Sequence, residues 1–442
     1  MNINVKKRPY KNVSPVLLSF FLTAFLIAFA PQTLSGYNNQ TPDSGNEQFL
    51  TGKAYFDQKD YTNAFEWFKK SAQQKNSDAE YYLGYMYENG LGVEYNYNVA
   101  EGWYKKSAEQ GNAAGQSKYG KFLDDGYEPD EDEVMSWFEK SALQGNADGQ
   151  YNLGRKYRNY RDYTKALKWL QKSADQGHKE GLSAFAHMYE DGEGVEKDYA
   201  KAVEYNKKLI ENNQYLGSAY YRLGELYRNG GYGLSKDIQE ALKWFKKSAD
   251  TENTSAQILL GQLYATGKEV ELDYQEAYKW FKMSADKDAL YGQYYLGLMY
   301  LNGLGVNQDY TEAAKWFHKC ADQQSYDIGR YELGKLYYGG NGVTKNYQEA
   351  FKWFKKSADY KNPFAQTALG HLYYEGHGVT KDYKEAVKWH KLSAEQGNAL
   401  GQYNLGYMYE NGLGVTKDLN EAKKWYTKSA AQGLTEAQDK LK

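Results

Sequence analysis

The stretch Tyr294–Gln324, YYLGLMYLNGLGVNQDYTEAAKWFHKCADQQ, decides the fold of this 442-residue chain. Apolar residues recur in it at helical spacing on both sides of the glycine-rich segment NGLGV, which predicts two short amphipathic helices joined by a tight loop. The same pattern returns along nearly the whole sequence. The chain is therefore expected to be a series of helical hairpins.

The tryptophans mark the period of the repeat. All 10 lie in one slot of the second helix, and successive slots are 32 to 39 residues apart when Tyr205 is counted in the slot between Trp169 and Trp244. One hairpin cannot bury its own apolar face, so neighbouring hairpins must stack, and we expect the tryptophans to form the structural core of the repeats. They are Trp67, Trp103, Trp137, Trp169, Trp244, Trp280, Trp316, Trp353, Trp389 and Trp425.

Glycines recur at fixed places in each hairpin. In the first helix a Leu-Gly pair such as Leu260-Gly261 repeats, although a helical glycine costs about 1 kcal/mol relative to alanine, so a neighbouring helix is expected to come close there. A G-x-G-V loop follows. Its first glycine is expected to end the helix in a left-handed conformation, and its valine to turn inward. An Asp such as Asp382 then caps the second helix.

The pattern A-x-x-x-L-G-x-x-Y-x-x-G-x-G-V, followed by A-x-x-W-[FY]-x-K-[SA]-A, resembles the Sel1-like repeat family, a relative of the tetratricopeptide repeat. The resemblance implies an all-α fold, a right-handed α-solenoid of about eleven helix-loop-helix repeats over residues 49–442 with a C-terminal half-repeat as a cap. It also implies a non-enzymatic scaffold or adaptor that binds a protein or peptide partner.

Residues 1–36 have the composition of a targeting segment. A basic stretch at 6–11 precedes the apolar run at 16–30, which is the order found in a secretory signal peptide. The run is shorter than the ~20 residues of a membrane-spanning helix. Pro31 follows the expected cleavage site, so an uncleaved membrane anchor is the alternative. We expect a bacterial periplasmic or secreted protein, or one held at the inner membrane by residues 16–30, with a flexible linker at 37–48.

The composition gives no reason to expect a nucleic acid, a metal or another cofactor. Lys and Arg total 55 against 57 Asp and Glu, so no basic excess favours nucleic-acid binding. The six histidines form no HExxH motif and are expected at the surface or in loops. The acidic segment 124–133 lacks the spacing of an EF-hand and is expected to be a solvated helix start.

An enzyme is the alternative class. Some secreted Sel1-like proteins with a cysteine pair in each repeat are described as binding or hydrolysing β-lactams, but this chain has the single cysteine Cys320. The string Ser284–Lys287 spells S-x-x-K, a β-lactamase-like motif, yet its partner motifs K-T-G and S-D-N are absent. Equivalent second helices end in similar strings, such as SADQ. The sequence therefore predicts no catalytic residues.

A tyrosine two positions before the Leu of many first helices is the candidate for partner binding. Two residues correspond to ~200° around a helix, so this side chain points away from the stripe that faces the second helix. Because Tyr is favoured at interfaces, one interpretation is a tyrosine-lined groove. The other is packing between successive first helices. The residues are Tyr81, Tyr151, Tyr221, Tyr294, Tyr331 and Tyr403.

Overall fold

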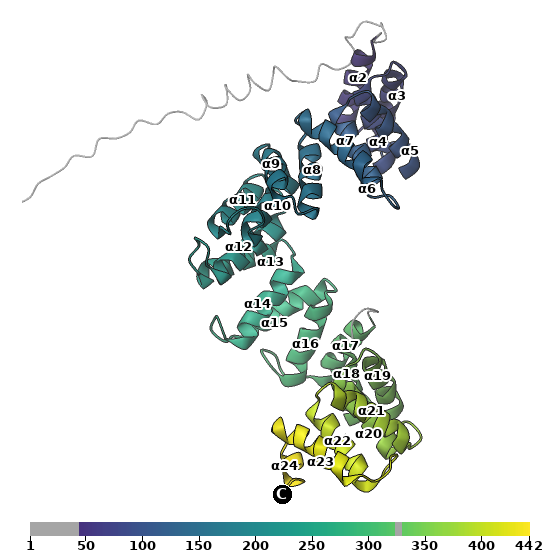
Figure 1. Ribbon diagram of the computed structural model, residues 1–442, viewed down its shortest axis with the longest axis vertical. Helices are drawn as coiled ribbons and strands as arrows, with labels where there is room; N and C mark the ends of the chain where they lie inside the picture. Colours follow the sequence, from purple (N-terminus) through teal and green to yellow (C-terminus); the bar gives the residue numbers. More distant parts are fainter. Residues whose placement is uncertain (1–43, 323–328) are drawn as a thin grey trace, which may run out of the picture. The chain divides into compact units, whose positions relative to one another are not determined.

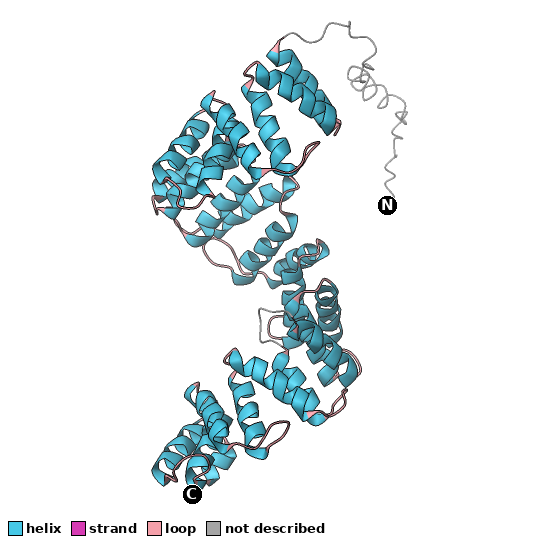
Figure 2. Cartoon of the chain, turned by 90° about the vertical axis from the view of Figure 1, so that its right-hand side faces the viewer, coloured by secondary structure: helices cyan, strands magenta, loops and turns pink. Residues whose placement is uncertain are grey.

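The computed structural model describes residues 44–322 and 329–442 (Figure 1). In these two ranges the chain forms 23 α-helices and no β-strand (Figure 2), which confirms the predicted all-α fold. The chain divides into two compact units, one ending at Lys156 and the other beginning at Tyr157. The predicted targeting segment 1–36 lies outside the described residues. None of the helices described has both the length and the apolar character needed to cross a membrane.

In the first unit, even-numbered helices are the first helices of the hairpins and odd-numbered helices are the second. The first helix, α2, starts inside the segment expected to be a linker, with Ser44 as its N-cap. The helices are α2 (Gly45–Asp57), α3 (Tyr61–Gln73), α4 (Ser77–Asn89), α5 (Tyr97–Glu109), α6 (Ala113–Asp124), α7 (Glu131–Leu143) and α8 (Ala147–Asn159), whose last residues belong to the second unit.

The second unit continues the same alternation. Each first helix contacts the second helix of its own hairpin and that of the hairpin before it. The last helix has only 5 residues and buries Ala437, as expected for a C-terminal cap. The helices are α9 (Tyr163–Asp175), α10 (Lys179–Asp191), α11 (Tyr199–Glu211), α12 (Leu216–Asn229), α13 (Ile238–Asp250), α14 (Thr254–Thr266), α15 (Tyr274–Asp286), α16 (Leu290–Asn302), α17 (Tyr310–Ala321), α18 (Arg330–Gly339), α19 (Tyr347–Asp359), α20 (Pro363–Glu375), α21 (Tyr383–Glu395), α22 (Ala399–Asn411), α23 (Leu419–Ala431) and α24 (Thr435–Asp439).

The loop between α16 and α17 shows how the glycines shape each hairpin. Gly303 ends α16 with a φ of 66°, a conformation that side chains resist. A Cβ on Gly305 would collide with the backbone carbonyl of Tyr274 on the preceding hairpin. Val306 packs against the core, and Asp309 caps α17 by accepting hydrogen bonds from two backbone N–H groups at 2.8 and 3.0 Å. These features confirm the predicted roles of the loop.

The glycine inside each first helix allows the two helices of a hairpin to approach closely. A Cβ built on Gly297 of α16 would lie 2.6 Å from a ring carbon of Phe317 on α17. A Cβ built on Gly334 would likewise lie 2.6 Å from a ring carbon of Phe354. The close approach predicted from the recurrence of this glycine is therefore confirmed.

Eight of the ten tryptophans pack into the core of the hairpin that precedes their own. Trp280 on α15 belongs to one core cluster with Phe245 of α13 and Leu260 of α14. Trp353 on α19 joins Phe317 of α17 in the same way. Neighbouring hairpins thus supply the missing half of each other's core, which is why a single hairpin cannot stand alone.

The depth of the tryptophans varies along the chain. Lysine ammonium groups cover many of the indole rings, for example Lys319 Nζ at 4.2 Å from the Trp316 ring centroid. Six indoles are buried, namely those of Trp169, Trp244, Trp280, Trp353, Trp389 and Trp425. Trp67, Trp103, Trp137 and Trp316 are half-buried. The core role expected for all ten is thus filled by complete burial in some hairpins and by partial burial in others.

Hydrogen-bonded glutamine amides link neighbouring hairpins. Gln402 Nε2 of α22 donates to the carbonyl of Ala394 on α21 at 3.2 Å, and Gln432 Nε2 donates to Gln402 Oε1 at 2.8 Å. The equivalent position in α4 holds Glu80, which accepts from Gln110 but, when ionised, has no proton to donate. Glu80 is only 4% exposed, so this substitution places a carboxylate in the core.

Candidate functional site

The six candidate tyrosines are all half-buried. Most of them contact an aromatic ring on the second helix of their own hairpin, as in Tyr294 and Phe317, whose ring centroids are 6.1 Å apart. Burial raises the pKa of Tyr294 to about 12. The corresponding pairs are Tyr81–Tyr104, Tyr221–Phe245, Tyr331–Phe354 and Tyr403–Tyr426. These five rings therefore contribute to packing within their hairpins.

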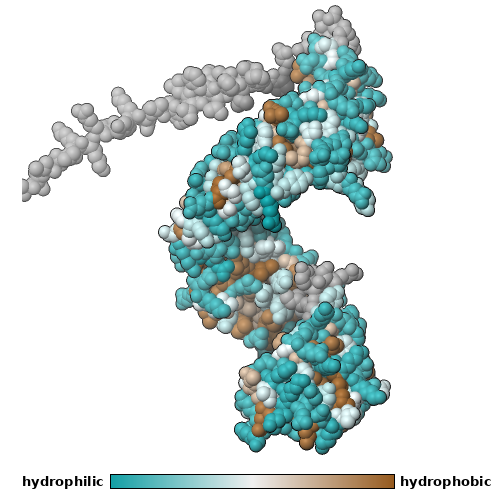
Figure 3. Space-filling model, viewed as in Figure 1, coloured by the Kyte–Doolittle hydropathy of each residue, from teal (hydrophilic) through white to brown (hydrophobic). Residues whose placement is uncertain are grey.

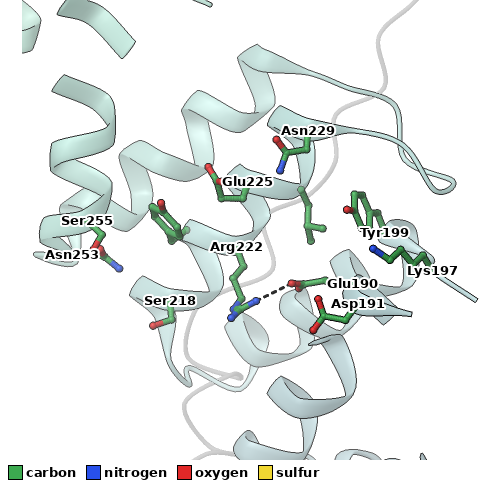
Figure 4. Close-up of a pocket in the computed structure, with 12 residues that line it drawn as sticks. Glu190, Asp191, Lys197, Tyr199, Ser218, Arg222, Glu225, Asn229, Asn253 and Ser255 are labelled. Atoms are coloured by element: carbon green, nitrogen blue, oxygen red, sulfur yellow. Dashed lines mark hydrogen bonds and ion pairs between the residues drawn. The ribbon is translucent and has the colours of Figure 1, made fainter. Parts of the chain in front are cut away.

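One of the six, Tyr221, also lines a cleft in the second unit. The cleft has a volume of 540 Å³ and lies between α10, α12 and the start of α14 (Figure 4). Residues of three successive first helices therefore meet at one place. Besides Tyr221, its lining includes Glu190, Asp191, Ser218, Arg222, Glu225, Asn229, Asn253 and Ser255.

Paired charges dominate the cleft. Arg222 reaches from α12 to α10, where its Nη1 donates to Glu190 Oε2 at 2.8 Å (Figure 4). Burial raises the pKa of Glu190 although Arg222 opposes the shift. Burial also raises the pKa of Tyr221, so its hydroxyl remains protonated at neutral pH. The cleft offers hydrogen-bonding groups and a neutralised ion pair, which suit contact with a polar protein segment.

The S-x-x-K string does not form an accessible nucleophile. Ser284 is 0% exposed, because its hydroxyl lies between α15 and the next first helix. A Cβ on Gly292 would lie 2.6 Å from Ser284 Oγ, so the next helix covers the side chain directly. A substrate cannot reach this hydroxyl while the hairpins remain stacked.

The expectation that the histidines lie at the surface or in loops is wrong for His390. This residue is 2% exposed and occupies the slot that holds Phe354 one hairpin earlier, with its ring against Gly370. Burial lowers its pKa to about 3. His187 is half-buried, and burial lowers its pKa to about 4. The sequence did contain a signal for this burial. His390 directly follows Trp389, at the position where the repeat pattern places the Phe of its W-F pair.

The acidic segment 124–133 behaves as a helix start with ion pairs. Asp130 caps α7, and Asp124 binds Lys156 Nζ at 2.6 Å. Across residues 44–322 and 329–442, no three His, Cys, Asp or Glu side chains come together in a way that could hold a metal ion. Cys320, in the slot of the repeat serine, is buried, and burial raises the pKa of its thiol to about 12.

Sequence reasoning missed the cleft itself. Glu190 lies on α10, whereas Arg222 and Glu225 lie on α12 of the next hairpin, so no single repeat reveals all three as neighbours. Comparing the residue after each Leu-Gly pair along the chain would have shown where the first helices differ from one another. Such a comparison distinguishes positions where stacking requires a particular residue type from positions where the residue type can vary.

Comparison with known proteins decides the family. The Sel1 repeat family matches eleven segments between residues 49 and 434. The chain belongs to the Sel1-repeat family. The matched segments are 49–76, 77–112, 113–146, 147–178, 181–213, 217–250, 254–288, 290–325, 328–359, 363–398 and 399–434.

Two solved structures support the same Sel1-repeat fold. The c5321 protein, described as a protective antigen present in uropathogenic Escherichia coli strains, is 30% identical with a TM-score of 0.60, and the match covers 97% of this chain and 89% of that one. A Sel1 repeat protein from Oxalobacter formigenes is also 30% identical, with a TM-score of 0.58 and coverage of 70% and 89%. This chain is thus similar to bacterial Sel1-repeat proteins over most of its length.

A curated relative is similar over a short stretch. The HRD3 component of an ERAD-associated E3 ubiquitin-protein ligase from Candida glabrata is 38% identical over 52 residues. This match covers 12% of the present chain and 6% of the relative. The similarity therefore concerns repeat units within a much longer protein.

Proposed function

We propose that this Sel1-repeat protein is a non-enzymatic scaffold that binds a partner protein through the first-helix face of residues 157–442. The observation that carries the proposal is the cleft between α10, α12 and α14. Polar side chains such as Ser218, Asn229 and Ser255 are among its lining residues, and three repeats contribute to it. A surface that several rigid hairpins build together is typical of repeat proteins that bind other proteins.

The relatives support a role in protein assembly. HRD3 is named as a component of a ligase complex, and Sel1 repeats serve as interaction scaffolds in proteins of this family. The buried state of Ser284 argues against the one catalytic motif in the sequence. The scaffold is therefore favoured over a β-lactam-binding or β-lactam-hydrolysing enzyme.

We further propose that the protein works outside the cytoplasm, in the periplasm or as a secreted protein. The support is the order of the basic stretch 6–11 and the apolar run 16–30 in the sequence. The description of c5321 as a protective antigen is in keeping with exposure to a host. Cell fractionation and N-terminal sequencing of the mature chain test this proposal and distinguish a cleaved signal from an inner-membrane anchor.

In-cell crosslinking tests the scaffold proposal. A photo-crosslinking amino acid at the exposed cleft residue Asn229 is expected to capture one protein in stoichiometric amount, identified by mass spectrometry. The matched control is the same amino acid at Gln239, which is exposed on the second helix of the same repeat and is expected to capture nothing. Equal capture at both positions, no capture at either, or turnover of a β-lactam by the purified protein would contradict the proposal.

A further inference from the structure

Two positions on the outer side of each first helix differ between repeats. They are the residue after the repeat glycine and the residue after the repeat tyrosine that follows. In all but two repeats at least one of the pair is Lys, Arg, His, Asp or Glu. The pairs are Lys53 and Phe56, Tyr85 and Glu88, Lys121 and Asp124, Arg155 and Arg158, His187 and Glu190, Glu225 and Arg228, Gln262 and Ala265, Leu298 and Leu301, Lys335 and Tyr338, His371 and Tyr374, and Tyr407 and Glu410.

The exceptions are the neighbouring repeats at 254–288 and 290–325. Their first helices, α14 (TSAQILLGQLYAT) and α16 (LYGQYYLGLMYLN), contain no charged residue at all. Because the other repeats fold with charged side chains at these positions, stacking does not require Ala265, Leu298 or Leu301 to be apolar. Leu298 and Leu301 pack against the core cluster of Phe317 and Trp353. The other repeats show that this packing tolerates charged residues at the same positions, so the apolar side chains are free to serve binding as well.

The two uncharged helices border a second cleft, with a volume of 420 Å³. Leu259, Ala265, Leu298 and Leu304 are among its lining residues, and each of them is half-buried. Hydrophobic residues gather on the surface over α14–α16 (Figure 3). A pocket of this size and character suits aliphatic or aromatic side chains.

The charged side chains at the edge of this cleft are engaged in ion pairs. Arg228 donates from Nε and Nη2 to the two carboxylate oxygens of Glu269, at 2.7 and 3.0 Å. The hydrogen bonds from Arg228 hold the pKa of Glu269 below its usual value. Arg228 Nη1 also lies 3.5 Å from Glu225 Oε1, so the charged side chain that lines the cleft is held by two carboxylates and offers no free positive charge to an acidic ligand.

Two amides provide polar contacts at the same edge. Gln262 Nε2 donates to the Tyr295 hydroxyl at 2.8 Å, and Asn302 Nδ2 donates to the carbonyl of Leu298 at 2.9 Å. These bonds fix both side chains and leave their carbonyl oxygens as acceptors. The cleft thus combines an apolar floor with oriented acceptors suited to peptide N–H groups.

We propose that the cleft between α14 and α16 binds a segment of a partner protein that presents uncharged aliphatic or aromatic side chains, with Ala265 and Leu298 selecting against charge. The inference rests on the proposed scaffold function, because it names the partner chemistry of the same first-helix face. The chain's own apolar run at 16–30 is a poorer match for this cleft. The basic stretch 6–11 lies close to that run in the sequence, and no acidic residue is among those that line the cleft to bind it.

The key variant, Ala265→Arg with Leu298→Glu, places at these positions the residues that the repeat at 217–250 holds there, Arg228 and Glu225. Because that repeat folds with them, the variant should fold, and circular dichroism checks this. Leu298→Gln alone is a milder variant, because Gln262 holds the same position one repeat earlier. The matched control is Leu392→Glu with Leu400→Arg, which charges two leucines that are 38% and 50% exposed outside the cleft.

The experiment is a selection of random displayed peptides on the full-length protein, followed by fluorescence anisotropy with the selected peptides. The expected result is enrichment of uncharged peptides rich in Leu, Ile, Phe or Met. Their affinity should fall by about tenfold or more in the Ala265→Arg, Leu298→Glu variant, an energy of about 1.4 kcal/mol, and remain unchanged in the control. A smaller loss in Leu298→Gln would support the same site.

Several outcomes would overturn the inference. They are selection of charged peptides, selection of none, or binding that the two cleft substitutions leave intact. Displacement of the selected peptides by a synthetic 16–30 peptide would assign the cleft to the chain itself. A dimer in sedimentation that the cleft variant abolishes would assign it to a second copy. If the partner captured at Asn229 still binds the cleft variant, the scaffold proposal stands and this inference fails.

Discussion

Trp280 and Phe245 belong to the same core cluster although they lie on different repeats. Phe245 comes from α13, and Trp280 comes from α15 of the following repeat. The cluster also contains Leu260 of α14, so the indole joins its own hairpin to the one before it. This relationship makes the energy of each repeat depend on the next one.

Replacing Trp280 by Ala should therefore destabilise two repeats at once. Trp280 is 5% exposed, and truncating a buried aromatic side chain costs about 3–5 kcal/mol. Urea unfolding followed by circular dichroism measures the loss. The matched variant is Trp67→Ala, whose half-buried indole should cost clearly less. Equal losses at the two sites would show that the contact with the preceding repeat is not what stabilises the array.

Gly297→Ala should destabilise the protein although alanine is the better helix former. The new Cβ would lie 2.6 Å from the ring of Phe317, and overpacking of this kind costs about 1–3 kcal/mol. Gly102 on α5 is the control, because a Cβ there meets nothing within 4 Å. Gly102→Ala should instead stabilise by up to about 1 kcal/mol. Thermal unfolding of both variants decides the matter, and a stabilising Gly297→Ala would contradict the close-approach argument.

His390 should make stability depend on pH. Its folded-state pKa of about 3 lies below the ordinary value of 6.5, so between these values the unfolded chain binds more protons. Stability is then fully present above pH 6.5 and falls as the pH drops toward 3, by up to about 1.4 kcal/mol per pH unit. His390→Phe places the residue of the preceding repeat in this slot and should remove that part of the dependence. Melting curves at neutral and acidic pH compare the two proteins.

Glu80→Gln should stabilise the protein at neutral pH. The glutamine supplies a donor for the carbonyl that Glu80, when ionised, cannot bond, a gain of about 1 kcal/mol. Burial raises the pKa of Glu80, so the folded state keeps its proton to higher pH than the unfolded chain, and stability falls as the pH rises through that interval. The gain in the variant should therefore shrink under acidic conditions. A constant gain from acid to neutral pH would rule out the buried charge as its cause.

Much of the fold could be predicted from one repeat unit, because local rules govern it. The cap at Asp309, the left-handed Gly303 and the contact of Gly297 with Phe317 each depend on residues within one hairpin or its neighbour. The spacing of the tryptophans was enough to require stacking. These features follow from helix periodicity and backbone sterics alone.

The binding surface could not be predicted in the same way. The cleft at Arg222 and Glu190 joins side chains of separate repeats, whose approach depends on how the hairpins stack. Periodicity placed Tyr221 on the outer side of α12 but could not show that its ring packs on Phe245 or that the residue also lines the cleft. The burial of His390 was missed because a histidine is expected at the surface. Its position in the repeat, which is that of the buried Phe354, pointed the other way.

Because the tryptophans pack into the core of the preceding hairpin, each hairpin depends on the one that follows it in the sequence. A repeat emerging from the ribosome has no closed interior until the following repeat, with its indole, has also been synthesised. Folding during translation must then proceed one hairpin behind synthesis, with a single unfinished edge that moves along the chain. At the last repeat no tryptophan follows, and α24 with its buried Ala437 covers that edge instead.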